Sequence, residues 1–145
     1  MTHSAPQLLH FGELSTRQLY GILRLRSDVF VVEQHCVFSD MDGRDADAST
    51  LHCWIEDADG GVVAALRVLD EGGGLHSVGR VVTHPRARRR GLARSLVEHA
   101  VRLTGPPLEL RAQAHLRDWY ARLGFVSTGE EWIEDRIPHL RMRLG

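Results

Sequence analysis

The stretch that decides the fold is Val81-Val82-Thr83-His84-Pro85-Arg86-Ala87-Arg88-Arg89-Arg90-Gly91-Leu92-Ala93-Arg94. It begins with strand-like apolar residues and continues through a polar loop into the apolar face of a helix. Its five arginines fall within nine positions, 86–94, at the point where that helix begins. A helix N-terminus carries about half a unit of positive charge, so it repels these cations unless an anion is bound there. Because the first backbone N–H groups of a helix bind anions well, the stretch predicts a phosphate site between a strand and a helix.

The loop itself, residues 84–90 (the arginine loop), has two other interpretations. The first is a solvated basic loop, and the second is part of an arginine-rich nucleic-acid module. The second needs a basic stripe, but the net charge of the chain is −1 and no such stripe accompanies the loop. The loop also lacks the Gly-Lys-Ser/Thr ending of a Walker A sequence. We therefore expect no nucleic-acid partner.

Length and composition bound the remaining classes of protein. The 145 residues suit one domain over residues 1–145, and 43% hydrophobic with 26% charged residues is typical of a globular protein. No run approaches the ~20 apolar residues of a membrane span, and no signal peptide is visible, so we expect a cytoplasmic protein without a membrane partner. Cys36 and Cys53 form neither a disulfide framework nor a CxxC motif, which predicts free thiols. All 18 basic residues are arginine, whose planar charge suits phosphate and carboxylate.

The hydrophobic pattern predicts the order of the elements. A Ser15…Gln18 capping box begins a helix that continues to about Val32. The other expected elements are a strand over 7–14, a loop over 33–50, strands over 51–55, 62–69 and 75–83, a helix over 92–103, a strand over 108–112, a helix over 116–123, and strands over 125–128 and 140–144. This order predicts an α+β, or mixed α/β, domain around one sheet.

The first motif with a family resemblance is Arg88-x-x-Gly91-x-Ala93, which follows a strand and opens a helix. It resembles the acyl-CoA signature of the GNAT N-acyltransferase superfamily. The resemblance implies a mostly antiparallel sheet flanked by helices, with a splayed strand pair that receives the acyl group. It also implies acetyl-CoA as the acyl donor. The backbone of Val81, Val82 and Thr83 would bind the pantetheine arm. The CoA-binding segment would be Arg88, Arg89, Arg90, Gly91, Leu92, Ala93 and Arg94, with the amides from Arg89 to Arg94 around the pyrophosphate.

The second motif is residues 113–125, which resemble the GNAT motif that ends in Tyr-x-x-x-Gly-Phe. The tyrosine of that motif falls on Tyr120, and the resemblance implies that its phenol protonates the departing CoA thiolate. Without the motif, Tyr120 would be interpreted as an amphipathic residue at the edge of the core. Many relatives have Asn seven residues earlier, where this chain has Gln113. Its amide would make similar contacts with CoA.

Three further segments resemble the ElaA-like subgroup of that superfamily. They are Asp28–Gln34, Asp42-Gly43-Arg44-Asp45 and Glu134–His139. The subgroup implies a stand-alone bacterial GNAT protein whose acceptor is poorly defined. The two cysteines and their neighbouring histidines do not have the spacing of a zinc site, and the aspartate run does not fit a calcium loop. We expect no metal.

The sequence does not identify the general base. An alkylammonium acceptor has a pKa near ~10, so it must lose a proton before it attacks the thioester. Some relatives use a carboxylate twelve residues before the tyrosine, but that position is Leu108, and Glu109 would face the other side of its strand. Glu33 and Asp42 are candidate carboxylates of the acceptor pocket, although each is also a common type of solvated or structural side chain.

The sequence therefore predicts an N-acetyltransferase. It would move an acetyl group from acetyl-CoA to a primary amine, on a small molecule or a peptide, by direct attack in a ternary complex. An acyl-CoA-binding sensor without turnover is the alternative, because no base is assigned. The sequence leaves a homodimer open.

Overall fold

A seven-stranded sheet with the order β1-β2-β3-β4-β5-β7-β6 runs through the protein. The structure is a computed structural model that describes residues 2–145. The strands are β1 Gln7–His10, β2 Leu51–Glu56, β3 Val62–Gly72, β4 Leu75–Thr83, β5 Leu108–Gln113, β6 Val126–Glu134 and β7 Ile137–Leu144. Neighbouring strands are antiparallel except β4 and β5, which are parallel. The expected mixed α/β fold around a mostly antiparallel sheet is confirmed.

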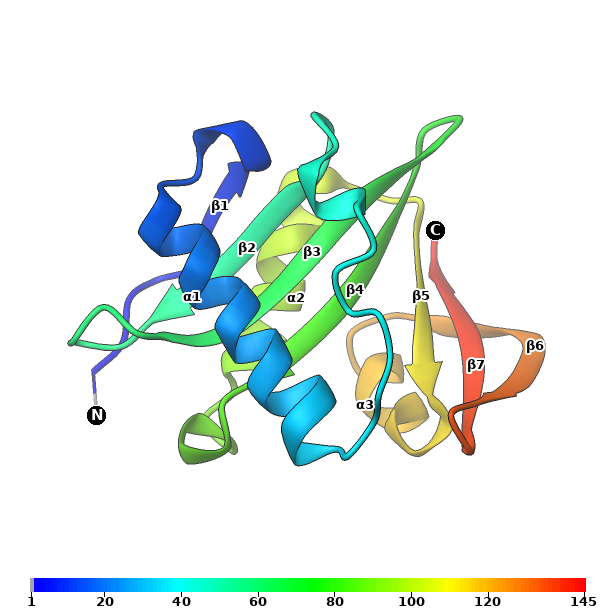
Figure 1. Ribbon diagram of the computed structural model, residues 1–145. Coiled ribbons are helices and arrows are strands. Elements are labelled where there is room, and N and C mark those ends of the chain that lie inside the picture. Colours follow the sequence, from blue (N-terminus) through cyan, green and yellow to red (C-terminus); the bar gives the residue numbers. More distant parts are fainter. Residues whose placement is uncertain (1) are drawn as a thin grey trace.

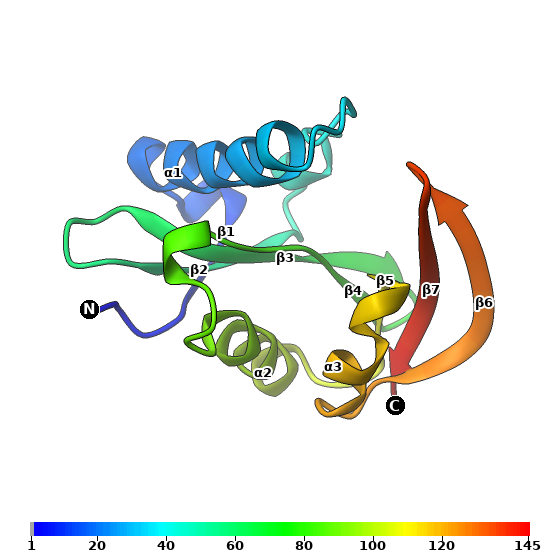
Figure 2. The same cartoon turned by 90° about the horizontal axis from the view of Figure 1, so that it is seen from below.

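Helices cover both faces of this sheet (Figure 1). α1, Thr16–Arg26, lies on one face, whereas α2, Leu92–Thr104, and α3, Arg117–Ala121, lie on the other (Figure 2). Successive strand residues point to opposite faces. In β2, Cys53 and Ile55 therefore join the core beneath α2 and α3, while Trp54 packs beneath α1. Among residues 2–145, no helix is long and apolar enough to cross a membrane.

The first helix begins as its sequence predicts. Ser15 Oγ accepts a hydrogen bond from the Gln18 amide at 3.1 Å, and Gln18 Oε1 accepts one from the Ser15 amide at 2.8 Å. The helix does not stay regular to Val32, because Ser27–Glu33 form a wider π-helical segment. Such segments often occur at functional sites.

Other predicted boundaries also differ from the structure; β3 continues past residue 69 to Gly72, and β7 begins at Ile137 instead of residue 140. The first strand ends at His10, because the Glu13 carboxylate accepts a hydrogen bond from the His10 amide at 2.8 Å and holds a 3-10 turn. α3 is shorter than residues 116–123 and is preceded by a 3-10 turn, Ala114–Leu116. β6 continues beyond residue 128 to Glu134. Its added residues are mostly exposed, so they lack the apolar alternation that signals a half-buried strand.

β4 and β5 separate from one another after a short parallel pairing. They pair only at His76–Leu108, Ser77–Glu109 and Val78–Leu110 within the described chain. Just beyond this point the register between β3 and β4 shifts, and Arg80 adopts a positive φ of 53°. A bulge of this kind bends the strand that carries it. The expected splayed strand pair is therefore present, and the β4 backbone beyond the bulge pairs with β3 on one edge and leaves the edge toward β5 open.

Candidate active site

The arginine loop leads from the open end of β4 into α2. It contains a 3-10 turn, Pro85–Ala87, and ends at Gly91, which is the residue before the helix and has a φ of 75°. Glycine suits this left-handed conformation because it has no Cβ. It also has no side chain to cap the first N–H groups of α2, which have no partner within the helix. A Cβ atom added at Gly91 would meet no atom within 4 Å, so the space beside Gly91 at the start of α2 is open.

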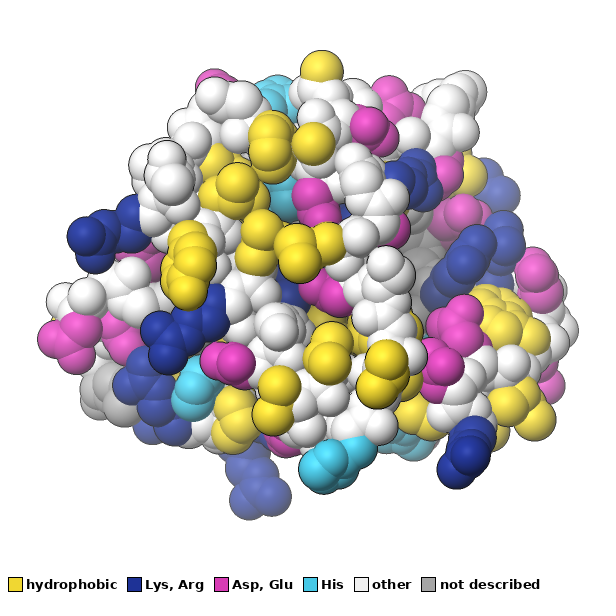
Figure 3. All heavy atoms as spheres, viewed as in Figure 1, with side chains coloured by type: hydrophobic (Ala, Val, Ile, Leu, Met, Phe, Trp, Pro, Cys, Tyr) yellow, Lys and Arg dark blue, Asp and Glu magenta, His cyan; other side chains and the backbone are white. Residues whose placement is uncertain are grey.

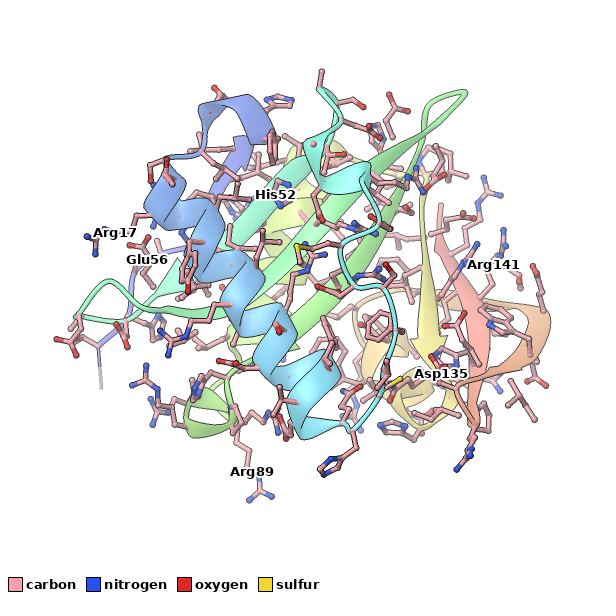
Figure 4. All side chains as sticks on the ribbon, viewed as in Figure 1. Arg17, His52, Glu56, Arg89, Asp135 and Arg141 are labelled. Atoms are coloured by element: carbon pink, nitrogen blue, oxygen red, sulfur yellow. The ribbon has the colours of Figure 1, made fainter. Side chains whose placement is uncertain are left out.

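The side chains of Arg86 and Arg88 attach the arginine loop to the rest of the protein. Arg88 Nε donates to the Thr83 carbonyl at 3.1 Å, and its two terminal nitrogens donate to the Glu33 carboxylate at 2.7 Å each. Arg86 pairs with Asp57 at 2.7 Å. Arg89 instead projects away from the sheet (Figure 4). The hydrogen bonds from Arg88 are the main reason that the pKa of Glu33 is lowered.

A cavity of about 330 Å³ lies between α2 and α3. It begins near the N-terminus of α2, at Arg94, and its wall carries two further guanidinium groups, those of Arg102 and Arg122. The other lining residues are Val97, Glu98, Val101 and Leu123. Guanidinium groups bind phosphate well, because their donors match two oxygens at once. The cavity therefore carries three guanidinium groups, of which Arg94 pairs with Glu98 at 3.4 Å.

Tyr120 lies on α3, on the same side of the sheet as this cavity. Its ring packs edge-on against Trp119 and Phe125, with centroid distances of 4.8 Å and 6.1 Å, and the residue is 7% exposed. Burial raises the pKa of Tyr120 to about 12, which keeps the phenol protonated at neutral pH. The ring contributes to the core, and the hydroxyl remains a proton donor. Its role as the acid stays a prediction, as does the CoA contact of Gln113, the half-buried last residue of β5.

On the α1 side, residues 34–46 pass over the region where β4 and β5 separate (Figure 1). An aspartate–arginine cluster beneath α1 fixes this segment; its members are Arg26, Asp40, Asp42, Asp45, Arg67 and Arg80. Arg26 and Asp45 approach to 2.7 Å, and the Arg26 side chain is 1% exposed. Arg67 and Asp42 also approach to 2.7 Å. The expected loop is present apart from a 3-10 turn at Arg44–Ala46, and three of its aspartates pair with arginines of α1, β3 and β4. Asp40 and Asp45 are buried, whereas Asp42 stays exposed.

These ion pairs determine the acidity of the aspartates. The hydrogen bonds from Arg67 are the main reason that the pKa of Asp42 lies far below its ordinary value. Burial by itself raises the pKa of Asp45, and the hydrogen bonds and charges of Arg26 and Arg67 more than reverse this, so the pKa is lowered. Sequence reasoning missed the cluster. The available signal was Arg26 and Arg67, each standing at a core-facing position of its element.

Glu33 and Asp42, the two predicted carboxylates of the acceptor pocket, have different partners. Glu33 contacts the arginine loop, whereas Asp42 belongs to the aspartate–arginine cluster. A carboxylate that is held by arginine and has a lowered pKa is a weak proton acceptor. Their place in the acceptor pocket stays a prediction.

A second group of polar side chains lies on the α1 side of β5, β7 and β6. The Arg111 guanidinium is 5.9 Å from the Trp132 ring, and Trp132 stacks on His139 at 6.1 Å. Arg141 pairs with Glu109 at 3.4 Å and with Glu130 at 2.9 Å. Figure 3 shows a hollow between the 34–46 segment and these strands, bordered by charged side chains. Sequence reasoning missed this group because the second half of β6 was not expected.

The two cysteines are free thiols, as predicted, and Cys53 is fully buried. Burial and the neighbouring Asp135 carboxylate raise the pKa of the Cys36 thiol. Asp135 stands at the turn between β6 and β7 (Figure 4), so the 34–46 segment meets that turn across the hollow. Within residues 2–145, no three His, Cys, Asp or Glu side chains form a group that could hold a metal ion.

Comparison with known proteins relates this geometry to a family. Residues 16–145 match the model of the acetyltransferase (GNAT) domain. The UPF0039 protein Rv2851c of Mycobacterium tuberculosis is 42% identical over 134 residues, which cover 90% of this chain and 86% of that protein. Protein ElaA of Escherichia coli is 37% identical over 145 residues, covering 94% of this chain and 93% of ElaA.

Solved structures agree with the sequence relatives. An acyl-CoA N-acyltransferase from Pseudomonas aeruginosa superimposes with a TM-score of 0.91 at 40% identity, over 99% of this chain and all of that one. The crystal structure of E. coli ElaA gives a TM-score of 0.89 at 35% identity, over 97% of this chain and 98% of that one. The chain therefore belongs to the GNAT acetyltransferase domain family, as its sequence motifs indicated, and it is a homologue of ElaA.

Proposed function

We propose that the protein is an N-acetyltransferase that moves an acetyl group from acetyl-CoA to a primary amine by direct attack in a ternary complex. Residues 1–145 would form one acyltransferase domain. The observation that carries the proposal is the gap between β4 and β5, which opens beside the uncapped N-terminus of α2. An extended thioester arm can enter the gap as an added strand while its diphosphate reaches the helix N-terminus.

The donor side of this site uses backbone groups more than side chains. The open edge of Val81, Val82 and Thr83 would bind the pantetheine arm, and the amides from Arg89 to Arg94 would bind the pyrophosphate. The fit is supported by Gly91, where a larger side chain would occupy the space in front of the helix. The arginines of the cavity between α2 and α3 are suited to the remaining phosphate of CoA.

Tyr120 would act as the general acid. Its raised pKa keeps the proton on the phenol until a stronger base is produced beside it, and a departing thiolate is such a base. The residue is held by its aromatic neighbours, which fix the direction of the hydroxyl. This rigidity suits a group that must meet the thiolate at one position.

An acyl-CoA-binding sensor is the second candidate. It is favoured by the pairing of Glu33 and Asp42 with arginine, which makes both carboxylates weak bases. The same donor site would then bind acetyl-CoA without turnover. The transferase and the sensor differ in one respect. The transferase has an amine acceptor, a small molecule or a peptide, and the sensor has none.

A thiol-release screen tests the proposal. Acetyl-CoA is mixed with the protein and with polyamines, amino acids, aminoglycosides and peptides, and free CoA is measured over time. A thermal-unfolding series with CoA runs in parallel, because a ligand of the folded state raises the melting temperature. Turnover with any amine supports the enzyme. A thermal shift without turnover supports the sensor, and the absence of both contradicts acyl-CoA binding.

A further inference from the structure

The histidine on β7 that faces the α1 side of the sheet stands next to the gap between β4 and β5. We infer that the imidazole of His139 is the general base that takes a proton from the acceptor amine. The inference rests on the proposed transferase function. It assigns the base, which neither the motifs nor the family comparison supplies.

The register of the sheet places His139 beside the gap. His139 pairs with Gln113, which lies three residues beyond Leu110, the last β5 residue paired with β4. Neighbouring strands are about 4.8 Å apart, so the ring stands one strand away from the open edge of β5. Leu140 and Met142 are buried in the core beneath α2 and α3. Because strand residues alternate, His139 points to the α1 side, opposite Tyr120.

This arrangement puts the two proton-transfer groups on opposite sides of the sheet. Tyr120 belongs to the core beneath α2 and α3, whereas His139 faces the hollow bordered by the 34–46 segment (Figure 3). In the tetrahedral intermediate the attacking nitrogen and the leaving sulfur are separate substituents of one carbon, so each can be served by its own proton-transfer group. A base at the nitrogen and an acid at the sulfur therefore match the reaction.

The hydrogen bonding of His139 leaves one nitrogen available as a proton acceptor. Its Nδ1 atom is 2.7 Å from the Ile137 carbonyl oxygen. A carbonyl oxygen only accepts hydrogen bonds, so Nδ1 carries a hydrogen and donates. In the neutral ring the Nε2 atom is then the acceptor. This tautomer is the one that a general base needs if Nε2 is to meet the amine.

The surroundings hold the ring in place and supply a partner for its charged form. Trp132, on the outer strand β6, stacks on the imidazole with an interplanar angle of 18°. The His139 side chain is 11% exposed, and Nε2 is 3.9 Å from the Glu134 carboxylate, close enough to stabilise an imidazolium but too far for a hydrogen bond. The charged or titratable groups on this face also include Arg111 and Glu109 of β5, Arg141 of β7, Glu130 of β6, Asp135 of the β6–β7 turn and Cys36 of the 34–46 segment.

The carboxylates near the gap are less suitable bases. Glu33 and Asp42 are each held by two hydrogen bonds from arginine, and Glu109 lies 3.4 Å from Arg141. Protonating any of them would weaken its ion pair. His139 has no such competing arginine contact among the described hydrogen bonds and ion pairs of residues 2–145.

The proton balance is simple. An acceptor ammonium loses two protons when it becomes an amide. His139 Nε2 takes the first, and the free lone pair then forms the C–N bond as the C–S bond breaks. The departing sulfur takes the Tyr120 proton, and the second nitrogen proton restores the phenol. His139 releases the first proton to solvent, so one proton is produced for each CoA thiol and amide formed.

The experiment compares His139→Asn with His10→Asn in the acceptor screen. The asparagine amide can replace Nδ1–H in the bond to Ile137 but has no basic nitrogen. His10 lies on β1, at the opposite edge of the sheet, and serves as the matched control. We expect His139→Asn to lower kcat by roughly 10²–10⁴-fold and to keep the CoA-induced thermal shift, while His10→Asn changes neither.

A measurement without turnover completes the test. Imidazole ¹⁵N NMR of the wild-type protein, assigned through bonds, should show His139 as the Nδ1–H tautomer above pH 8, including when CoA is bound. An Nε2–H tautomer overturns the inference even if His139→Asn fails to fold. A folded His139→Asn variant with kcat within twofold of wild type overturns the assignment of His139 as the general base and leaves the proposed transferase function standing. A wild type that binds CoA but acetylates no amine overturns both the base and the proposed transferase function.

Discussion

Glu33 and Arg88 are separated by 55 residues in the chain and are joined by two hydrogen bonds of 2.7 Å. The pair connects the end of the π-helical segment to the arginine loop, next to the uncapped N-terminus of α2. Both side chains are about 40% exposed (41% and 39%), so the pair contributes little to stability. Its main effect is electrostatic, because it puts a carboxylate beside the expected pyrophosphate.

Removing that carboxylate should strengthen CoA binding. Glu33→Gln deletes one negative charge near an anion site, and we expect the Kd for CoA to fall by about 2–5-fold at low salt. The gain should shrink in 0.5 M salt, because exposed charges are screened. Arg88→Ala should weaken CoA binding instead. Isothermal titration of both variants checks the signs, and equal Kd values in Glu33→Gln and wild type at low salt would contradict the electrostatic role.

Blocking the space in front of α2 should abolish CoA binding. Gly91→Glu places a side chain and a negative charge where the pyrophosphate is expected, so the thermal shift produced by CoA should be lost. The matched control is Gly74→Glu, in the turn between β3 and β4. Gly74 has a φ of 84°, close to the 75° of Gly91, and also has no atom within 4 Å of an added Cβ. Both variants introduce the same charge at a glycine with a similar positive φ. They differ only in whether the new side chain lies at the start of α2. A normal thermal shift in folded Gly91→Glu would remove the basis of the donor assignment.

Tyr120→Phe should separate chemistry from packing. The ring contacts with Trp119 and Phe125 are kept, so the free energy of unfolding and the Kd for CoA should change little. Loss of the general acid should lower kcat by roughly 10²–10⁴-fold, nearer the lower value because a thiolate is a good leaving group. The KM for acetyl-CoA should be less affected. Steady-state CoA release measures both constants, and a variant within about twofold of wild type would reduce Tyr120 to a packing residue.

Breaking the aspartate–arginine cluster should destabilise the fold. Asp45→Asn removes one of the two carboxylates that pair with each of Arg26 and Arg67, which keep Asp40 and Asp42, so we expect a cost of up to about 3 kcal/mol, the lower end of the range for breaking a buried ion pair. Asp47→Asn, two residues later at an exposed position, is the control and should change stability by less than about 0.5 kcal/mol. Urea unfolding followed by circular dichroism gives both values. Similar losses in the two variants would mean that the cluster does not stabilise the protein.

The same cluster predicts sensitivity to acid. The pKa values of Asp42 and Asp45 are lowered in the folded protein, so these groups stabilise it above their unfolded pKa of about 3.9. That contribution is lost as pH falls through the lower, folded values. The free energy of unfolding should therefore drop steeply below about pH 4, and Asp45→Asn should show a shallower drop because it has lost one of these groups. Urea unfolding at a series of pH values measures the two slopes.

Local signals in the sequence predicted local structure well. The Ser15 capping box needs only Gln18, and the strand–loop–helix around Gly91 is determined by consecutive residues. The partners of the aspartate–arginine cluster are far apart in the chain; Arg67 and Asp42, for example, are 25 residues apart. No periodic pattern connects such positions. The surroundings of His139 depend on β6. The exposed residues of β6 show no apolar alternation, so the full length of that strand could not be predicted.

The sheet keeps apart the segments that would meet the two substrates. α2 and α3 lie on one face, and α1 with residues 34–46 lies on the other (Figure 2). Substitutions at well-separated positions have nearly independent effects. Under the proposed function, substitutions in residues 34–46 and the β6–β7 hairpin would change the acceptor range while the proposed CoA-binding residues of the other face stay the same. We therefore expect paralogues that share acetyl-CoA as the acyl donor and differ in the amine that they acetylate.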